Sequence, residues 1–182
     1  MKKHRPTYNI AVLNQAAGGN RILNDGLGPN AFSRIGRDVL EQSGVRYAMI
    51  WEGVNDIGVA DPDPTSQKEI GDRLIVAFQQ IVTQIHAAGI PVFGATITPF
   101  GTPPGSDVIQ AYSDPEREKT RQRVNEWIRT SNVFDAVLDF DKVLRDPKVP
   151  SQLATQYDFG DHLHPNVEAY HALVDYFPLS VF

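Results

Sequence analysis

Residues 91–97 read Pro-Val-Phe-Gly-Ala-Thr-Ile, a nearly unbroken apolar run that stands between a helical pattern and a long loop. Three more short runs share this character: residues 10–13 (Ile-Ala-Val-Leu), 46–51 (Arg-Tyr-Ala-Met-Ile-Trp) and 136–140 (Ala-Val-Leu-Asp-Phe). Short apolar runs without strict alternation are typical of strands that are buried on both faces, as in a parallel sheet. The sequence therefore predicts four such strands.

Helical patterns separate these runs. Residues 30–42 and 66–88 carry apolar side chains at helical spacing, and Gly89 follows the second stripe as a natural C′ residue. Residues 113–116 (Ser-Asp-Pro-Glu) resemble a capping box that opens a helix to about residue 130, and residues 166–176 form a last helical pattern. Alternating strands and helices predict an α/β fold whose ligands bind beyond the carboxyl ends of the strands.

Composition narrows the class of protein. The 182 residues suit a single domain, 1–182, and 41% hydrophobic with 21% charged residues is ordinary for a globular protein. A net charge of −5 without a Lys/Arg-rich face argues against a nucleic-acid partner, and the absence of cysteine excludes disulfides and thiolate chemistry. No apolar run approaches the roughly 20 residues of a membrane span. Residues 1–5 resemble the start of a signal peptide, but the apolar stretch that follows is too short, so the compartment stays open.

Two glycine- and amide-bearing segments follow predicted strands. Residues 14–21 (Asn-Gln-Ala-Ala-Gly-Gly-Asn-Arg) contain paired glycines, which let a backbone N–H approach a ligand, or simply form a βα turn. Residues 52–56 (Glu-Gly-Val-Asn-Asp) place the Asn55 carboxamide where it can point at a developing oxyanion, or where it caps a turn.

A third segment, residues 161–166 (Asp-His-Leu-His-Pro-Asn), carries candidate acid–base chemistry. Asp161 can accept the Nδ1 proton of His164 and so raise the basicity of Nε2, while Pro165 is expected to start a helix. The alternatives are a helix cap with exposed histidines and a metal site of the His-x-His type. No third distant ligand stands out, so we expect neither metal nor cofactor. Thr98, at the end of the third predicted strand, is expected to line the substrate pocket.

In order and spacing, Gly-Gly-Asn (18–20), Gly-Val-Asn-Asp (53–56) and Asp-His-Leu-His-Pro-Asn (161–166) resemble the second, third and fifth sequence blocks of the SGNH (GDSL-type) hydrolases. The resemblance covers nearly the whole chain and implies a three-layer α/β/α sandwich with a flavodoxin-like parallel sheet. It also implies hydrolysis of esters, often of acetyl or short acyl groups on carbohydrates or lipids. By this resemblance Gly19 and Asn55 form the oxyanion hole, and His164 is the base that Asp161 orients. Asn20 and Asp56 then join Thr98 as candidates for substrate contact.

The first block of the family, a strand ending in Gly-Asp-Ser with the nucleophilic serine, is not found in the 182 residues. We therefore expect an SGNH fold missing its first strand and weak or no esterase activity. Ser106, in the loop of residues 99–112, is the one serine on the expected active-site face, and we interpret it as a turn residue because a mobile loop cannot preorganise a nucleophile.

The missing strand would lie between the first two strands of this chain, so we expect the strand at 10–13 to pair with 46–51, or the gap to be filled by dimerisation or by another polypeptide. The expected ligand is a small acyl ester or an acylated carbohydrate. Two further hypotheses remain: a non-catalytic binding protein that keeps the pocket, and a fragment completed by a homodimer.

Overall fold

Three strands form one parallel sheet in the computed structural model, which describes residues 7–182. The strands β1 (Ala48–Ile50), β2 (Val92–Ala95) and β3 (Ala136–Leu138) lie in the order β1-β2-β3. Phe93 of β2 stands opposite Met49 on one side and Ala136 on the other. All four residues of the central strand are buried, which explains its unbroken apolar sequence. Three of the four predicted strands are confirmed.

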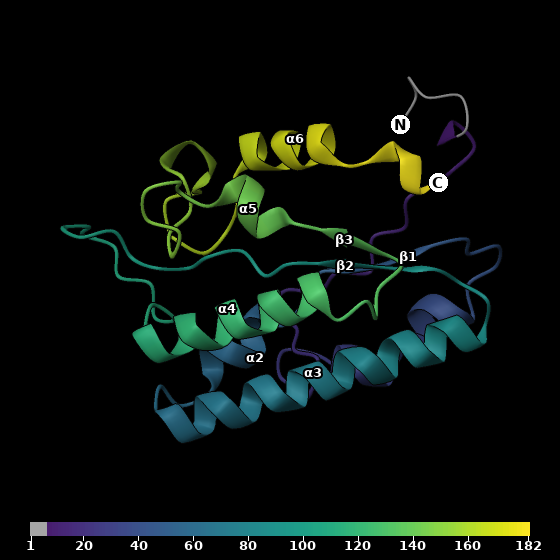
Figure 1. The fold of residues 1–182 in the computed structure, drawn as a ribbon, viewed down its shortest axis with the longest axis horizontal. Helices are drawn as coiled ribbons and strands as arrows, with labels where there is room; N and C mark the ends of the chain where they lie inside the picture. Colours follow the sequence, from purple (N-terminus) through teal and green to yellow (C-terminus); the bar gives the residue numbers. More distant parts are fainter. Residues whose placement is uncertain (1–6) are drawn as a thin grey trace.

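Helices cover both faces of this sheet (Figure 1). On one face lie α2 (Val54–Val59), α3 (Pro64–Ala87) and α4 (Pro115–Thr130), and on the other lie α5 (Phe140–Leu144) and α6 (Val167–Tyr176). The predicted helix at 30–42 is α1 (Ala31–Ile35), which continues as the π-helix η2 (Gly36–Leu40), and two single 3₁₀ turns complete the chain, η3 (Thr155–Tyr157) and η4 (Leu179–Val181). The fold is the expected three-layer α/β/α sandwich, here with a three-stranded open sheet.

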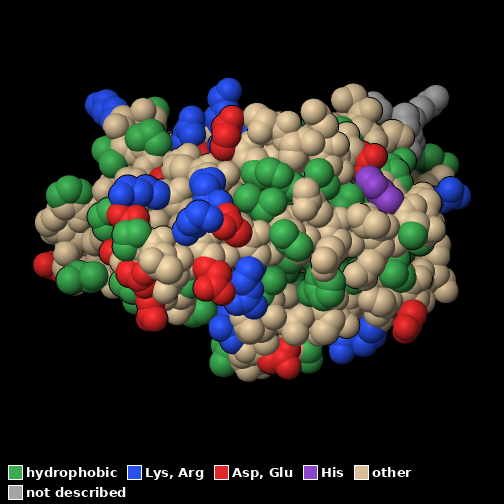
Figure 2. All heavy atoms as spheres, turned by 60° about the horizontal axis from the view of Figure 1, so that its bottom comes forward, with side chains coloured by type: hydrophobic (Ala, Val, Ile, Leu, Met, Phe, Trp, Pro, Cys, Tyr) green, Lys and Arg blue, Asp and Glu red, His purple; other side chains and the backbone are tan. Residues whose placement is uncertain are grey.

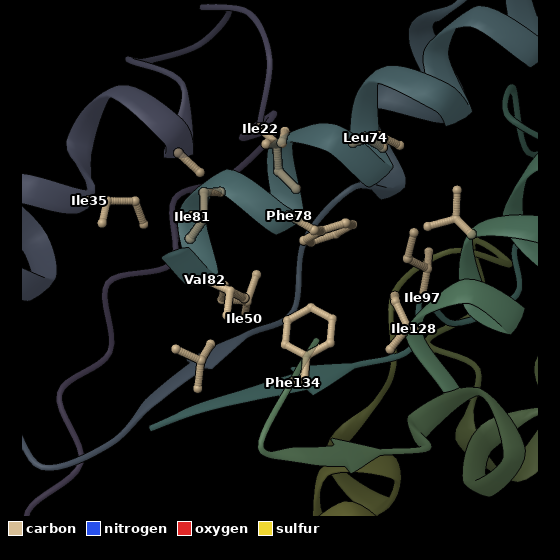
Figure 3. Packing of buried hydrophobic residues seen from close by; sticks show 14 of the residues in the cluster. Ile22, Ile35, Ile50, Leu74, Phe78, Ile81, Val82, Ile97, Ile128 and Phe134 are labelled. Atoms are coloured by element: carbon tan, nitrogen blue, oxygen red, sulfur yellow. The ribbon is translucent and has the colours of Figure 1, made fainter. Parts of the chain in front are cut away.

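Two apolar clusters fill the space between the layers. One packs under α3 and α4 and contains Phe78, Ile128 and Phe134 (Figure 3), and the other packs under α5 and α6 around Phe140. Successive residues of β2 serve the two clusters alternately, as the period of a strand requires. A Cβ at Gly94 would lie 2.6 Å from the Phe134 ring, so glycine is needed at that position of the strand.

Side-chain caps fix where the long helices begin. Asp63 accepts hydrogen bonds from the backbone N–H groups of the first turn of α3, and Asn166 accepts one from Ala169 in α6. The last helix therefore begins after Asn166, and the prediction that Pro165 starts it is wrong. The cap of α4 is Asp114, not a capping box led by Ser113, because the Ser113 hydroxyl accepts instead from the Thr102 N–H at 2.8 Å.

The predicted strand at residues 10–13 is wrong. The segment pairs with no strand in the described part of the chain, and Val12 and Leu13 are largely exposed. The expected pairing of this segment with residues 46–51 is wrong as well, since β1 pairs with β2 alone. An apolar run becomes a strand only where a neighbour offers backbone N–H and C=O groups, and no described strand pairs with this one. Dimerisation across the open edge stays a prediction.

The surface of the α3 and α4 layer carries both signs of charge. Figure 2 shows acidic and basic side chains interspersed on this face, and several form ion pairs: Lys68–Asp72, Arg123–Asp72 and Lys119–Glu116. Exposed pairs of this kind contribute only about 0.2–1 kcal/mol each. Within residues 7–182, none of the helices combines the length and the apolar character that a membrane crossing requires.

Candidate active site

Asn55 lies in the first turn of α2, directly after the edge strand β1. Gly53 is the N-cap of this helix. Its φ of +108° favours glycine, and a Cβ added there would lie 3.1 Å from the Ile97 side chain. The Asn55 Nδ2 donates to the Asn20 carbonyl at 2.9 Å, and the Tyr112 hydroxyl donates to Asn55 Oδ1 at 3.2 Å. The orientation of the carboxamide is thereby fixed, and among residues 7–182 its second N–H has no acceptor.

The glycine loop is fastened to α2 by its neighbours. The buried Asp56 carboxylate accepts from the Ile22 N–H at 2.8 Å and from the Leu23 N–H at 3.0 Å. Asn20 is buried too, and its Oδ1 accepts from Arg34 at 2.7 Å. These contacts give Asn20 and Asp56 a positioning role, and their predicted contact with substrate stays a prediction.

Gly19 itself is exposed and has a φ of +67°. A Cβ on this residue would lie 2.7 Å from the end of the Leu27 side chain. No hydrogen bond from the Gly19 N–H is found among the described residues. The backbone donor that an oxyanion hole needs is thus not consumed within this part of the chain.

Burial is the main influence on the pKa values of two acidic groups, Glu52 and Asp56. It raises the pKa of Glu52 to about 7, against the opposing charge of Arg34, whose guanidinium lies 4.0 Å away. Burial also raises the pKa of Asp56, although the hydrogen bonds from Ile22 and Leu23 work in the other direction. Near neutral pH Glu52 is therefore only partly ionised, which limits the negative charge close to Asn55.

His164 and Asp161 form an exposed pair in the loop before α6. His164 Nδ1 lies 2.6 Å from Asp161 Oδ2, and the two side chains are 68% and 37% exposed. Burial alone would raise the pKa of Asp161, but hydrogen bonds from the His164 backbone, the His164 ring and the Leu163 N–H together hold it below its usual value. An ionised Asp161 keeps the proton on Nδ1 and leaves Nε2 as the free base. Within residues 7–182, Nε2 has no hydrogen-bond partner.

A second His–Asp pair, Asp158 and His162, lies in the same loop and is not predicted by the sequence pattern. His162 Nδ1 is 2.5 Å from Asp158 Oδ2, and His162 Nε2 is 2.7 Å from the Ser106 hydroxyl. These two side chains are only 12% and 10% exposed. The signal is present in the sequence, since two aspartates precede two histidines at short spacing, but the sequence pattern assigns His162 only to a possible His-x-His metal site and does not pair it with Asp158.

The loop of residues 99–112 joins the two halves of the site. The Gln110 side chain donates to the Asp161 carbonyl at 2.9 Å, and Tyr112, two residues later, holds Asn55. The Tyr112 ring packs against α2, because a Cβ at Gly58 would lie 2.2 Å from it. Asn55 and the His164–Asp161 pair are thereby fixed to one loop.

Not every predicted residue is connected in this way. Among the described residues, no hydrogen bond joins the His164 ring to Gly19 or to Asn55. Thr98 is buried in the extension of β2, so its place in the pocket wall stays a prediction. Within residues 7–182, no three His, Asp or Glu side chains lie together in a way that could hold a metal ion.

Comparisons with known proteins agree with this architecture. One similar structure is a GDSL-like lipase from Bacteroides thetaiotaomicron VPI-5482, with 18% identity over 82% of this chain and 68% of that chain, and a TM-score of 0.62. Another is a catalytic mutant of an acetylxylan esterase from Geobacillus stearothermophilus, with 19% identity over 82% of this chain and 64% of that chain, and a TM-score of 0.55. No curated protein matches the sequence. The sequence pattern of the GDSL-like lipase/acylhydrolase family matches residues 2–172. The chain belongs to the GDSL-like lipase/acylhydrolase family.

Proposed function

We propose that this chain carries a carboxylic-ester hydrolase site in which His164 is the general base and Asp161 orients it. The Gly19 N–H and the Asn55 carboxamide form the oxyanion hole. The observation that carries this proposal is the 2.6 Å contact between His164 Nδ1 and Asp161, which leaves an exposed Nε2 without a described partner in a member of a hydrolase family.

The chemistry follows from these positions. The Nε2 atom of His164 takes the proton of an attacking hydroxyl group, and the charge that develops on the imidazole is stabilised by Asp161. The tetrahedral intermediate places its negative oxygen against the donors of Gly19 and Asn55. When the intermediate collapses, the ester C–O bond breaks and the leaving alcohol takes the proton back from His164.

The attacking group decides how fast the reaction runs. The 182 residues contain no Gly-Asp-Ser, and the hydroxyl that His164 activates in this chain is then that of water. Removing the nucleophile from a serine hydrolase costs on the order of 10⁶-fold in turnover and leaves about 10³–10⁴-fold over water. We therefore expect slow hydrolysis.

For the substrate, we propose a small acyl ester or an acetylated carbohydrate. The likeness in fold to an acetylxylan esterase supports an acetyl group. The lack of a Gly-Asp-Ser block also favours a second candidate function, in which the same pocket binds a carbonyl or carboxylate group without turning it over.

The test is steady-state hydrolysis of p-nitrophenyl acetate by the purified 182-residue chain. Wild type is expected to run slightly above the buffer rate, and His164→Ala is expected to remove at least about 90% of that excess, since general-base catalysis is typically worth 10²–10⁴-fold. Asn55→Ala should lower it as well. His171→Ala, in an exposed position on α6, is the matched control and should leave the rate unchanged.

Two outcomes would separate the candidates. An excess rate that survives both His164→Ala and Asn55→Ala would remove the hydrolase proposal. Saturable binding of acetate that needs Asn55, without any excess rate in the wild type, would select the binding function instead.

A further inference from the structure

A hydroxyl, an imidazole and a carboxylate are aligned outside the proposed hydrolase residues. Ser106 Oγ lies 2.7 Å from His162 Nε2, and His162 Nδ1 lies 2.5 Å from Asp158 Oδ2. We propose that Ser106, His162 and Asp158 form a second nucleophilic site, which takes small activated acyl or phosphoryl groups on Ser106 Oγ. This inference does not depend on His164 being a base.

The hydrogen bonds around Asp158 favour the required tautomer. Its Oδ1 accepts from the backbone N–H groups of Gly160 at 2.8 Å and His162 at 3.0 Å, which leaves Oδ2 for the ring. A carboxylate on Nδ1 holds the proton there, so Nε2 is the acceptor and Ser106 the donor. This is the arrangement in which an imidazole can remove a proton from a hydroxyl group.

The Ser106 hydroxyl also has hydrogen-bond partners within its own loop. Ser106 Oγ lies 2.9 Å from the Val108 carbonyl and 3.1 Å from the Val108 N–H. When His162 is charged and donates through Nε2, a neutral Ser106 can donate to the Val108 carbonyl instead. The Val108 N–H remains a donor toward Oγ in both states, so it stabilises a partly negative oxygen during attack.

Small molecules can reach this site, although the His162 and Asp158 side chains are nearly covered. Ser106 is itself only partly buried, and its neighbours Gly105 and Asp107 are exposed. A Cβ added to Gly105 or to Gly160 would meet nothing within 4 Å, so both sides of the triad border open space. A contact that served only to fasten two loops would not need such access.

The proposed step balances as follows. With an ester, Ser106 Oγ forms a bond to the acyl carbon, the ester C–O bond breaks, and the serine proton passes through His162 Nε2 to the leaving alcohol. With diisopropyl fluorophosphate, Oγ bonds to phosphorus, the P–F bond breaks, and fluoride leaves while the proton passes through His162 to the buffer. We assign no separate oxyanion hole here, and we therefore expect a stable adduct rather than rapid turnover.

The experiment treats the 182-residue protein with diisopropyl fluorophosphate and follows the adduct by intact mass and peptide fragmentation. One adduct is expected, on Ser106, and Ser106→Ala should lose it. His162→Ala should slow labelling at least about 100-fold, the usual worth of a positioned base, and Asp158→Asn should slow it less. His164→Ala should leave the labelling rate unchanged within about twofold, since within residues 7–182 no hydrogen bond joins that ring to Ser106.

Matched controls separate chemistry from loop order. Ser113→Ala removes another hydroxyl from the same region, and Gln110→Ala removes another bond between the same two loops; neither should change labelling of Ser106 much. The proposal is overturned if Ser106 takes no adduct, if His162→Ala labels as fast as wild type, or if Gln110→Ala slows labelling as much as His162→Ala does. None of these results bears on the proposed hydrolase function, which is tested separately by the hydrolysis rate of His164→Ala.

Discussion

The two His–Asp pairs in residues 158–164 have the same local construction and different surroundings. In both, one carboxylate oxygen accepts two backbone N–H groups and the other accepts the ring Nδ1. The His164 ring is 68% exposed and its Nε2 has no hydrogen-bond partner in the described part of the chain, whereas the His162 ring is 12% exposed and its Nε2 lies 2.7 Å from the Ser106 hydroxyl. Two closely spaced His–Asp pairs thus present one exposed ring and one covered ring.

The loop of residues 99–112 causes this difference. It places Ser106 over His162 and binds the Asp161 carbonyl through Gln110, but it leaves the ring of His164 uncovered. A His–Asp spacing in a sequence therefore predicts the tautomer of the ring, while the task of the ring is decided by what the rest of the chain lays against Nε2.

The largest expected effect concerns stability. Asp158→Ala leaves the Gly160 and His162 N–H groups and a covered imidazole without their acceptor, and we expect a loss of about 2–3 kcal/mol in the free energy of unfolding. Asp161→Ala removes the same number of bonds in an exposed setting, where water replaces them, and we expect about 1 kcal/mol or less. Urea unfolding at pH 7 measures both.

Asp175→Ala, at the end of α6 and exposed, is the control for removing an acidic group and should change the free energy of unfolding little. Equal losses for Asp158→Ala and Asp161→Ala would mean that coverage by the loop of residues 99–112 does not distinguish the two pairs. The two pairs would then differ in geometry but not in their contribution to stability.

The fold was predictable where a run of residues carries its own signal. The central strand β2 is buried on both faces, and its apolar run predicts this burial. Helices α3 and α6 are predicted by apolar side chains at helical spacing. Residues 10–13 have the same apolar character, yet they form no strand and residues 11–13 are exposed. Strand formation depends on a neighbour that no local pattern can reveal. The short helix α2 was missed because six residues carry too little periodicity.

The contacts of the candidate site likewise include one that the sequence predicts and one that it does not. The contact between Asp161 and His164 spans three residues and follows from local spacing. The contact between Ser106 and His162 spans 56 residues, and it depends on how an irregular loop folds back over another. The sequence predicts a mobile loop around Ser106, but the Gln110 side chain donates to the Asp161 carbonyl and so ties this loop to its neighbour, while the Ser113 hydroxyl accepts from the Thr102 N–H and holds the two ends of the loop together. Such ties lie beyond sequence patterns.

A smaller effect is expected in the reactivity of the two rings. Diethyl pyrocarbonate should modify His164 at least about tenfold faster than His162, because freeing His162 Nε2 costs one hydrogen bond of about 1–1.5 kcal/mol. Ser106→Ala should raise the rate at His162 and leave that at His164 unchanged. Peptide mass mapping over time gives both rates, and equal rates in the wild type would break the contrast between an open and a covered ring.

The smallest effect is the contribution of Asp161 to the pH dependence of stability. Its pKa is lower in the folded chain than in the unfolded one, so its ionisation stabilises the fold above about pH 3.9, the ordinary value for aspartate, and this contribution is lost as the pH falls through the folded pKa. Because the side chain is 37% exposed, solvent screening limits the contribution to about 0.5 kcal/mol. Urea unfolding of wild type and Asp161→Asn should therefore differ by this small amount at pH 7, and the difference should shrink as the pH falls through the folded pKa of Asp161. A difference that did not shrink on acidification would come from the lost hydrogen-bond acceptor rather than from charge, and Asp161 would then hold the His164 ring as an uncharged acceptor does.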